Sequence, residues 1–224
     1  MEKKESPKKE SLKKDNISSP RISGLSDKAL GIIKFILGIC LLPFVYSFTR
    51  GFLGEFSLIG KQLQNYFWAG VISLVIIHLV VWEPVVFYTR GQKIVEVLFI
   101  FFKPFVKFAP FLLPIYTIIL FILYSLFSLT RTNNLINIFI FLIGLTIALH
   151  LVFSAKTVRS KQGDFLKANY IFGFSLIYII NIILLVLGLN LVFQGFSMVN
   201  FFDNSFQIAH NIFSAVFKQL FFNQ

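Results

Sequence analysis

This sequence is poor in charge and in cysteine, and each shortage excludes a class of protein. Only 14% of its 224 residues are charged, whereas a soluble domain carries about 25%. A soluble fold of this composition would have too few polar side chains to cover its surface. The single cysteine, Cys40, cannot form an internal disulfide, and without a Cys-x-x-Cys pair or a Cys/His cluster the chain offers no cysteine metal site. P-loop and Rossmann glycine patterns are missing as well.

What the chain does contain is apolar. Hydrophobic residues make up 56% of it, with 30 Phe, and they gather in blocks of roughly 20 residues, enough to cross about 30 Å of hydrocarbon. Backbone groups in lipid must satisfy their own hydrogen bonds, so a span is a helix or part of a closed barrel. Barrel strands would be short and alternating, whereas these blocks are continuous. We therefore predict an all-α, polytopic transmembrane helix bundle.

The distribution of positive charge predicts the topology of this bundle. The expected spans are 29–49, 66–86, 109–130, 135–154 and 169–194, within a transmembrane domain over 29–194. Sixteen Lys and Arg fall in 1–28, 87–108 and 155–168, against four in the alternate segments and Lys34 in the first span. Because basic residues collect on the cytoplasmic side, the N-terminus and the loops 87–108 and 155–168 are expected there. The net charge of +11 thus reports orientation in the bilayer, and no nucleic-acid partner is expected.

The two ends of the chain differ from the spans. Residues 1–28 mix eight basic and five acidic side chains with Ser, Pro and Asn, so we expect a disordered basic cytoplasmic tail. The C-terminal segment 195–224 is amphipathic, and it forms either an interfacial helix on the outer side, which we favour, or a sixth span with its polar stripe turned inward. That stripe comprises Asn200, Asp203, Asn204, Gln207, His210, Asn211, Ser214 and Lys218.

A second amphipathic segment lies between the second and third spans. In 93–108 the charges Lys93, Glu96, Lys103 and Lys107 fall on one stripe of a helix. This helix either lies on the cytoplasmic leaflet or folds back into the bundle, where Lys93 and Glu96 would be buried and paired. Irregular backbone is also expected around it, because prolines interrupt helices. The prolines are Pro84, Pro104, Pro110 and Pro114.

Three ionisable residues fall within or near the expected spans. Such residues are costly at membrane depth and suggest a functional site. His78 and Glu83 belong to the second span and His150 to the fourth, so all three could approach one another if these spans pack together. His78 and Glu83 are five residues apart and therefore about 140° apart around a helix. A structural role is favoured for each histidine, and a small transporter or channel component using all three residues is the alternative function.

A family resemblance rests on the segments YTRGQKIVE and FAPFLLPIYTIILF and on two later apolar stretches. They resemble bacterial membrane proteins related to the intramembrane zinc metallopeptidases of the site-2-protease type. In that family an aromatic-led segment ends in Gly and continues as His-Glu-x-x-His, followed by Ala-Pro-aromatic and Pro-x-Tyr-Thr. The positions that carry the resemblance are Tyr88, Gly91, Ala109, Pro110, Pro114, Tyr116, Thr117, Gly144, His150, Gln162, Asp164, Phe174, Ser175 and Asn181.

The metal motif of this family is degenerate here. Gln92 stands for the first His, Lys93 for the Glu that activates water and Glu96 for the second His. Gln is a poor zinc ligand, and a Lys cation would repel the metal. The resemblance therefore implies a pseudo-peptidase in a cell membrane of the bacterial inner-membrane type, without metal, cofactor or catalytic residue. Its expected partners are the lipid bilayer and a membrane protein that it binds or scaffolds; an active hydrolase with an unrecognised site is a third alternative.

Overall fold

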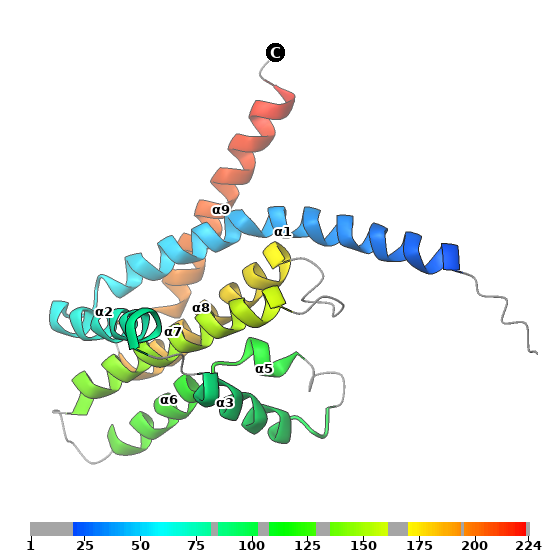
Figure 1. The fold of residues 1–224 in the computed structure, drawn as a ribbon. Coiled ribbons are helices and arrows are strands. Elements are labelled where there is room, and N and C mark those ends of the chain that lie inside the picture. Colours follow the sequence, from blue (N-terminus) through cyan, green and yellow to red (C-terminus); the bar gives the residue numbers. More distant parts are fainter. Residues whose placement is uncertain are drawn as a thin grey trace, which may run out of the picture.

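The computed structural model describes residues 20–81, 85–102, 108–128, 135–160, 170–193 and 195–222, with side chains from residue 29 onward except at Ser160. Over these residues the fold is entirely helical, so the predicted all-α class is confirmed (Figure 1). A π-helical turn, η1, continues α2. The elements are α1 (Pro20–Phe56), α2 (Lys61–Ile76), η1 (Ile77–Val81), α3 (Val85–Leu98), α5 (Ala109–Leu112), α6 (Ile115–Ser128), α7 (Ile136–Ser160), α8 (Tyr170–Val192) and α9 (Met198–Phe221).

Four of the described helices are long and apolar enough to cross a membrane. They cover Ala29–Phe56, Lys61–Val80, Ile136–Arg159 and Tyr170–Val192. At 1.5 Å per residue even the shortest, with 20 residues, reaches about 30 Å, which matches the hydrocarbon thickness. These helices correspond to the first, second, fourth and fifth expected spans, and they make the chain a membrane protein by length and composition.

The third expected span, 109–130, is divided into two helices. The four-residue α5 ends at Leu112, and the backbone of the next residue, Leu113, is extended with φ −101° and ψ 118°. Helix α6 follows with 14 residues. Pro114 causes the break, because its ring disfavours the helical conformation of the preceding residue and it has no N–H to donate. The irregular backbone expected at the prolines is thus present here, and α6, about 21 Å long, is short for a full span.

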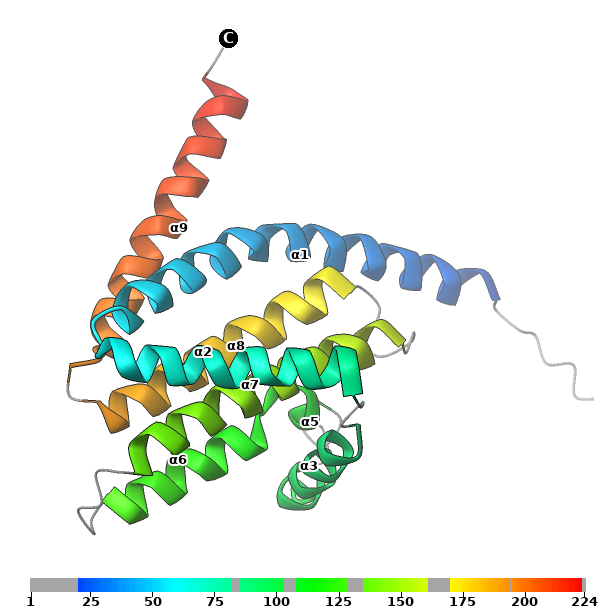
Figure 2. The same cartoon turned by 60° about the vertical axis from the view of Figure 1, so that its left-hand side comes forward.

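Close helix packing at the centre of the bundle depends on two glycines. Helices α2 and α7 form the most extensive contact (Figure 2). An added Cβ on Gly70 would collide with the carbonyl oxygen of Phe141, and one on Gly144 would collide with that of Phe67. Because small residues let two backbones approach each other in a membrane, this reciprocal pair brings α2 onto α7.

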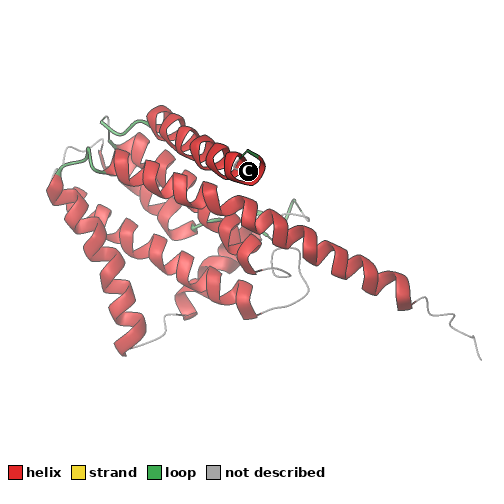
Figure 3. Cartoon of the chain, turned by 90° about the horizontal axis from the view of Figure 1, so that it is seen from above, coloured by secondary structure: helices red, strands yellow, loops and turns green. Residues whose placement is uncertain are grey.

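Helix α9 packs on α1 and then projects away from the bundle (Figures 1 and 3). Its buried face consists of Phe201, Ser205 and Ala209, whereas the members of its polar stripe are exposed, apart from a half-buried Ser214. The N-terminus of α9 is anchored by Glu55, a buried carboxylate of α1 that accepts a hydrogen bond from the Ser197 amide at 3.3 Å. A sixth span with its stripe turned inward does not agree with this arrangement.

Several expected boundaries change. Helix α1 begins at Pro20, so residues 20–28 of the expected tail are helical, while 1–19 lie outside the described residues. The amphipathic helix expected over 93–108 instead covers Val85–Leu98, because its apolar face already begins beside α7. Positions 103–107 lie outside the described residues, as do Glu83, Pro84 and 161–169.

Candidate functional site

The candidate site lies where α3 meets α5, α6 and α7. Helix α3 buries Tyr88, Gly91 and Val95, whose spacing of three and four residues puts them on one face. At Gly91 the approach is close, because an added Cβ would lie 2.8 Å from the Tyr116 ring. Tyr116 in turn donates a hydrogen bond from its hydroxyl to the carbonyl of Phe87 at 2.7 Å. The glycine and this hydrogen bond fix α3 against the start of α6.

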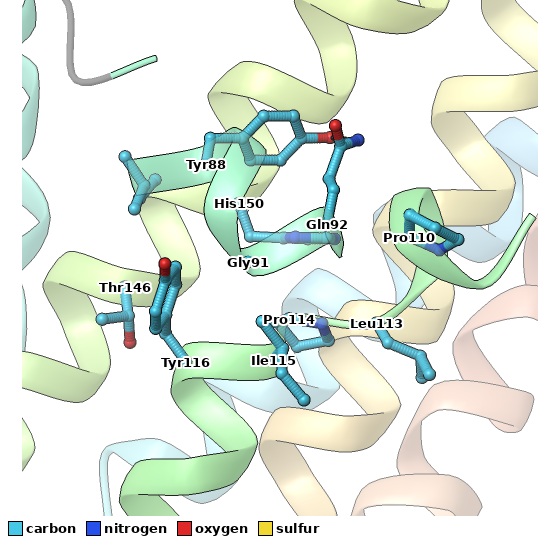
Figure 4. Close-up of a pocket in the computed structure, with 11 residues that line it drawn as sticks. Tyr88, Gly91, Gln92, Pro110, Leu113, Pro114, Ile115, Tyr116, Thr146 and His150 are labelled. Atoms are coloured by element: carbon cyan, nitrogen blue, oxygen red, sulfur yellow. Dashed lines mark hydrogen bonds between the residues drawn. The ribbon is translucent and has the colours of Figure 1, made fainter. Parts of the chain in front are cut away.

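A chain of hydrogen bonds runs through this site from α3 to α5. Gln92 donates from Nε2 to the Tyr88 hydroxyl at 2.9 Å (Figure 4). The Tyr88 hydroxyl lies 3.0 Å from Oγ of Ser154, and Ser154 donates to the carbonyl oxygen of Phe111 at 3.3 Å. Because Ser154 has one hydrogen, Tyr88 is the donor in their bond. His150 Nε2 lies 3.1 Å from the same carbonyl of Phe111, which makes Nε2 the protonated nitrogen.

The break between α5 and α6 explains why polar side chains occur here at all. Carbonyls at the end of α5 have no partner within a continuing helix, and unpaired backbone groups at membrane depth are costly. His150 and Ser154 of α7 satisfy the carbonyl of Phe111. Asn181 of α8 donates from Nδ2 to that of Leu112 at 3.2 Å. The polar groups therefore stabilise an irregular backbone that Pro114 imposes.

Little free space remains within the site. The cavity between Tyr88, Gln92, Pro110, Tyr116 and His150 has a volume of about 10 Å³, which is at the lower limit for one water molecule. Burial raises the pKa of the Tyr88 phenol, and its hydrogen bonds with Ser154, Thr157 and Gln92 oppose this shift. Tyr88 therefore stays protonated at neutral pH, as its role of donor requires. The site is therefore filled by a hydrogen-bonded network.

The structure separates the three positions of the degenerate motif. Gln92 is half-buried and belongs to the network, whereas Lys93 and Glu96 are exposed on the outer face of α3. The alternative in which Lys93 and Glu96 are buried and paired is therefore wrong, because the face of α3 that packs inward is the one with Tyr88 and Val95. A neutral amide, an exposed cation and an exposed carboxylate do not fit a zinc site.

The ionisable residues of the spans are also separated. His150 is buried and hydrogen-bonded. His78, in η1, packs its ring edge-on against Phe153 with centroids 5.5 Å apart, and among the described residues its buried Nδ1 has no hydrogen-bond partner. Glu83 lies outside the described residues. Within the described part of the chain, no three His, Cys, Asp or Glu side chains come together as a metal site would need.

Sequence reasoning missed Ser154 and the hydrogen-bonding role of Tyr88. Ser154 is fully buried and lies one turn after His150, and Tyr88 lies one turn before Gln92. The signal was available as two polar pairs at i, i+4 spacing. It becomes distinctive only when α3 and α7 are placed side by side.

An open apolar groove adjoins the filled cavity. It has a volume of about 280 Å³ and lies between α2, η1, α3, α6 and α7. Tyr116, Thr146 and Leu149 line both spaces. The other residues that line the groove are Leu74, Ile77, Phe87 and Leu145. Its lining carries no charged side chain, so it suits an apolar occupant.

The segments that carry the sequence resemblance meet at this site. Tyr88 and Gly91 of the first, Pro110 and Pro114 of the second and His150 of the third line the same small cavity. In comparisons with family models, curated proteins and solved structures, nothing matches this chain. Membership of the metallopeptidase-related family stays a prediction.

Proposed function

We propose that this chain is a non-catalytic membrane protein with a pseudo-peptidase core, and that its apolar groove binds a transmembrane helix of a partner protein. The observation that carries the proposal is the conformation of Gln92. Its amide replaces the first metal-binding His of the motif and is committed to a structural hydrogen bond with Tyr88. This hydrogen bond lies within α3 and holds the Tyr88 hydroxyl, which bonds to Ser154 of α7, so Gln92 has a structural role in place of a metal-binding one.

The remaining geometry of the site supports the loss of catalysis. A peptidase needs room for a peptide bond and an activated water beside its catalytic groups, whereas the cavity next to Gln92 and His150 is about 10 Å³. The Lys93 and Glu96 side chains point away from that cavity and are exposed. His150 is occupied by the Phe111 carbonyl, which also speaks against the transporter alternative that requires it to bind or relay an ion.

The groove supports the choice of partner. Its residues come from helices of the apolar bundle, and it is about 280 Å³ in volume, enough for several large side chains from one face of a helix. An apolar groove beside the former active site is where an intramembrane peptidase would hold a helical substrate. A chain that lacks the catalytic residues but retains the groove would bind such a helix without cleaving it.

Photocrosslinking tests the groove directly. Phe87 lines it and Phe127 does not, yet both are 49% exposed, so they form a matched pair. Benzoylphenylalanine at position 87 should crosslink to one discrete membrane protein in intact membranes, while the same group at 127 should react with lipid. Identical products at the two positions would contradict the proposed binding groove.

Metal analysis tests the loss of catalysis independently of the partner. Protein purified without chelators should contain far less than one zinc per chain, because the residues at the motif positions do not make a site. Stoichiometric zinc that is lost in a His150→Ala variant would instead indicate an enzyme with other ligands. A variant with Gln92→Leu serves as the control, since it changes the motif position without removing a metal-binding group.

We further propose that the N-terminus is cytoplasmic. In Figure 2, α3, the end of α7 and the start of α8 lie at the same end of the bundle. These elements belong to or adjoin the basic segments 87–108 and 155–168, and basic segments collect on the cytoplasmic side. In a Cys40→Ser background, a cysteine at Ser57 should react with an impermeant maleimide on intact cells. A cysteine at Ser160 should react only after permeabilisation, and the reverse pattern would invert the topology.

A further inference from the structure

Helix α9 has an apolar face that the rest of the described structure leaves largely uncovered. Its buried face against α1 ends at Ala209, and Phe213, Val216 and Leu220 continue the same side of the helix at spacings of three and four residues. Their side chains are 38%, 47% and 72% exposed. Figures 1 and 2 show that this part of α9 projects away from the bundle. A contiguous exposed apolar face marks a site of contact with a membrane or another protein.

The start of α9 is fixed at the ends of two helices that are long enough to span a membrane. The Ser197 amide donates to Glu55 of α1 at 3.3 Å, and the Met198 amide donates to Oδ1 of Asn190 in α8 at 3.1 Å. Both acceptors lie within the last three residues of the apolar stretches of their helices. Helix α9 therefore begins at the level where these two spans reach one surface of the bilayer.

From this level α9 runs back along α1 toward the hydrocarbon. The ring of Phe206 contacts that of Phe48 with centroids 6.1 Å apart, and Phe213 contacts Phe44 with centroids 5.5 Å apart. Phe44 precedes the exposed Arg50 by six residues, which is about 9 Å along a helix. An exposed guanidinium near the end of a span reaches the membrane surface, so Phe213 lies up to about 9 Å below this surface. Interfacial helices bury their apolar face to a similar depth of about 5–10 Å.

The charge of α9 does not favour a particular lipid headgroup. The charges of Asp203 and Lys218 cancel, and apart from His210 the other members of the polar stripe are Asn, Gln and Ser. Without a surplus of Lys or Arg, the helix gains no electrostatic attraction to anionic lipids. Its affinity for a bilayer then depends on the apolar area that it buries. Because Phe rings are bulky, they enter most readily where the lipids are loosely packed.

We propose that the distal part of α9, residues 210–221, inserts its apolar face into the adjacent leaflet and recognises loosely packed lipid rather than headgroup charge. A second copy of the chain is the competing occupant. A stable dimer buries about 800 Å² per partner, whereas one aromatic side chain buries at most about 250 Å². The five large apolar side chains exposed on this part are 38% to 72% exposed, so they provide less than that area, and lipid is the better match. They are Phe213, Val216, Phe217, Leu220 and Phe221.

Spin labels on the full-length protein test this insertion. In a Cys40→Ser background, one label replaces either Leu220 on the apolar face or Asn211 on the polar stripe, which are nine residues apart and thus on opposite sides of the helix. Collisions with oxygen report contact with hydrocarbon, and collisions with a water-soluble nickel chelate report contact with water. In dioleoylphosphatidylcholine vesicles the label at position 220 should lie about 5–10 Å below the phosphates, while the label at position 211 stays in contact with water. Equal nickel accessibility at the two positions would overturn the proposal.

Lipid composition tests what α9 recognises. Replacing about a third of the neutral lipid by phosphatidylglycerol should change the oxygen-to-nickel collision ratio at position 220 less than about twofold, because Asp203 and Lys218 cancel. Dimyristoylphosphatidylcholine rich in cholesterol, which packs tightly, should lower the ratio at least about threefold. A ratio that rises with the anionic lipid, or that is unchanged in the tightly packed vesicles, would refute the recognition of loose packing. Protection of position 220 from nickel that disappears when the protein is diluted with lipid would identify a second copy as the occupant and overturn the proposal.

Two substitutions that add the same charge locate the insertion. Phe217→Asp, at a position 55% exposed beside the apolar face, should move the label at position 220 out of the hydrocarbon, because a carboxylate at that depth is costly. The ring of Phe217 contacts Phe221 and Phe222 at the same end of α9, so this variant leaves the core unchanged. Asn211→Asp, on the polar stripe, should leave the label where it is. A label that stays in the hydrocarbon in Phe217→Asp would refute the assignment of this face.

Discussion

Removing the Tyr88 hydroxyl is the most direct test of the network at the degenerate motif. In Tyr88→Phe, Gln92 loses its acceptor and the fully buried Ser154 loses its donor. Leaving a buried polar group unsatisfied costs about 1–3 kcal/mol in soluble proteins, but single hydrogen bonds in membrane proteins average about 0.6 kcal/mol. With two bonds lost, we expect the free energy of unfolding to fall by about 1–2 kcal/mol.

A double-mutant cycle separates this effect from lost packing. Ser154→Ala removes the partner of Tyr88, so in the double variant neither group is left unsatisfied, and the two costs should fall short of additivity by about 0.5–1.5 kcal/mol. The assay is reversible unfolding in mixed micelles of a mild detergent and dodecyl sulfate. Tyr170→Phe, a hydroxyl deletion at an exposed position of α8, is the matched control and should change stability by less than about 0.5 kcal/mol. Strict additivity, or a Tyr88→Phe variant as stable as the control, would refute the network.

Three further predictions follow from the packing. Gly144→Ala should cost about 1–3 kcal/mol, because its methyl group would meet the Phe67 backbone; Gly31→Ala, with open space around it, should be neutral in the same unfolding assay. Lys93→Gln and Glu96→Gln should each change stability by less than about 0.5 kcal/mol, and their effects should add, since both side chains are exposed. A strong coupling between the two effects would indicate instead that Lys93 and Glu96 form a buried pair. Glu55→Ala should remove the acceptor for the amide that begins α9 and expose that helix to limited proteolysis, and an unchanged digestion pattern would show that α9 is held by other contacts.

Pro114 was an accurate guide to local structure, whereas the sequence did not show which contacts the histidines of the spans would make. Proline acts on the φ and ψ of its own and the preceding residue, so the break at Pro114 follows from sequence alone. Whether His78 and His150 approach each other, as they could if their spans packed together, depended on how the two helices are rotated against each other. In the described structure the Phe153 ring contacts His78, while His150 turns to the carbonyl of Phe111.

Composition and block length were sufficient to determine that this is a helical membrane protein, because the bilayer imposes its thickness and its hydrogen-bond requirement on any chain that crosses it. The sequence also shows directly that Gln92 and Lys93 stand where the family that it resembles has a metal-binding His and a water-activating Glu. Tertiary structure alone decided that Gln92 turns inward while Glu96, one turn later, is exposed, and that the buried Asn181 donates to the carbonyl of Leu112 on another element. The physical reason is that hydrogen-bond partners and cavities form between segments far apart in the chain, and the close approach of helices that creates them depends on contacts such as Gly70 with Phe141 and Gly144 with Phe67.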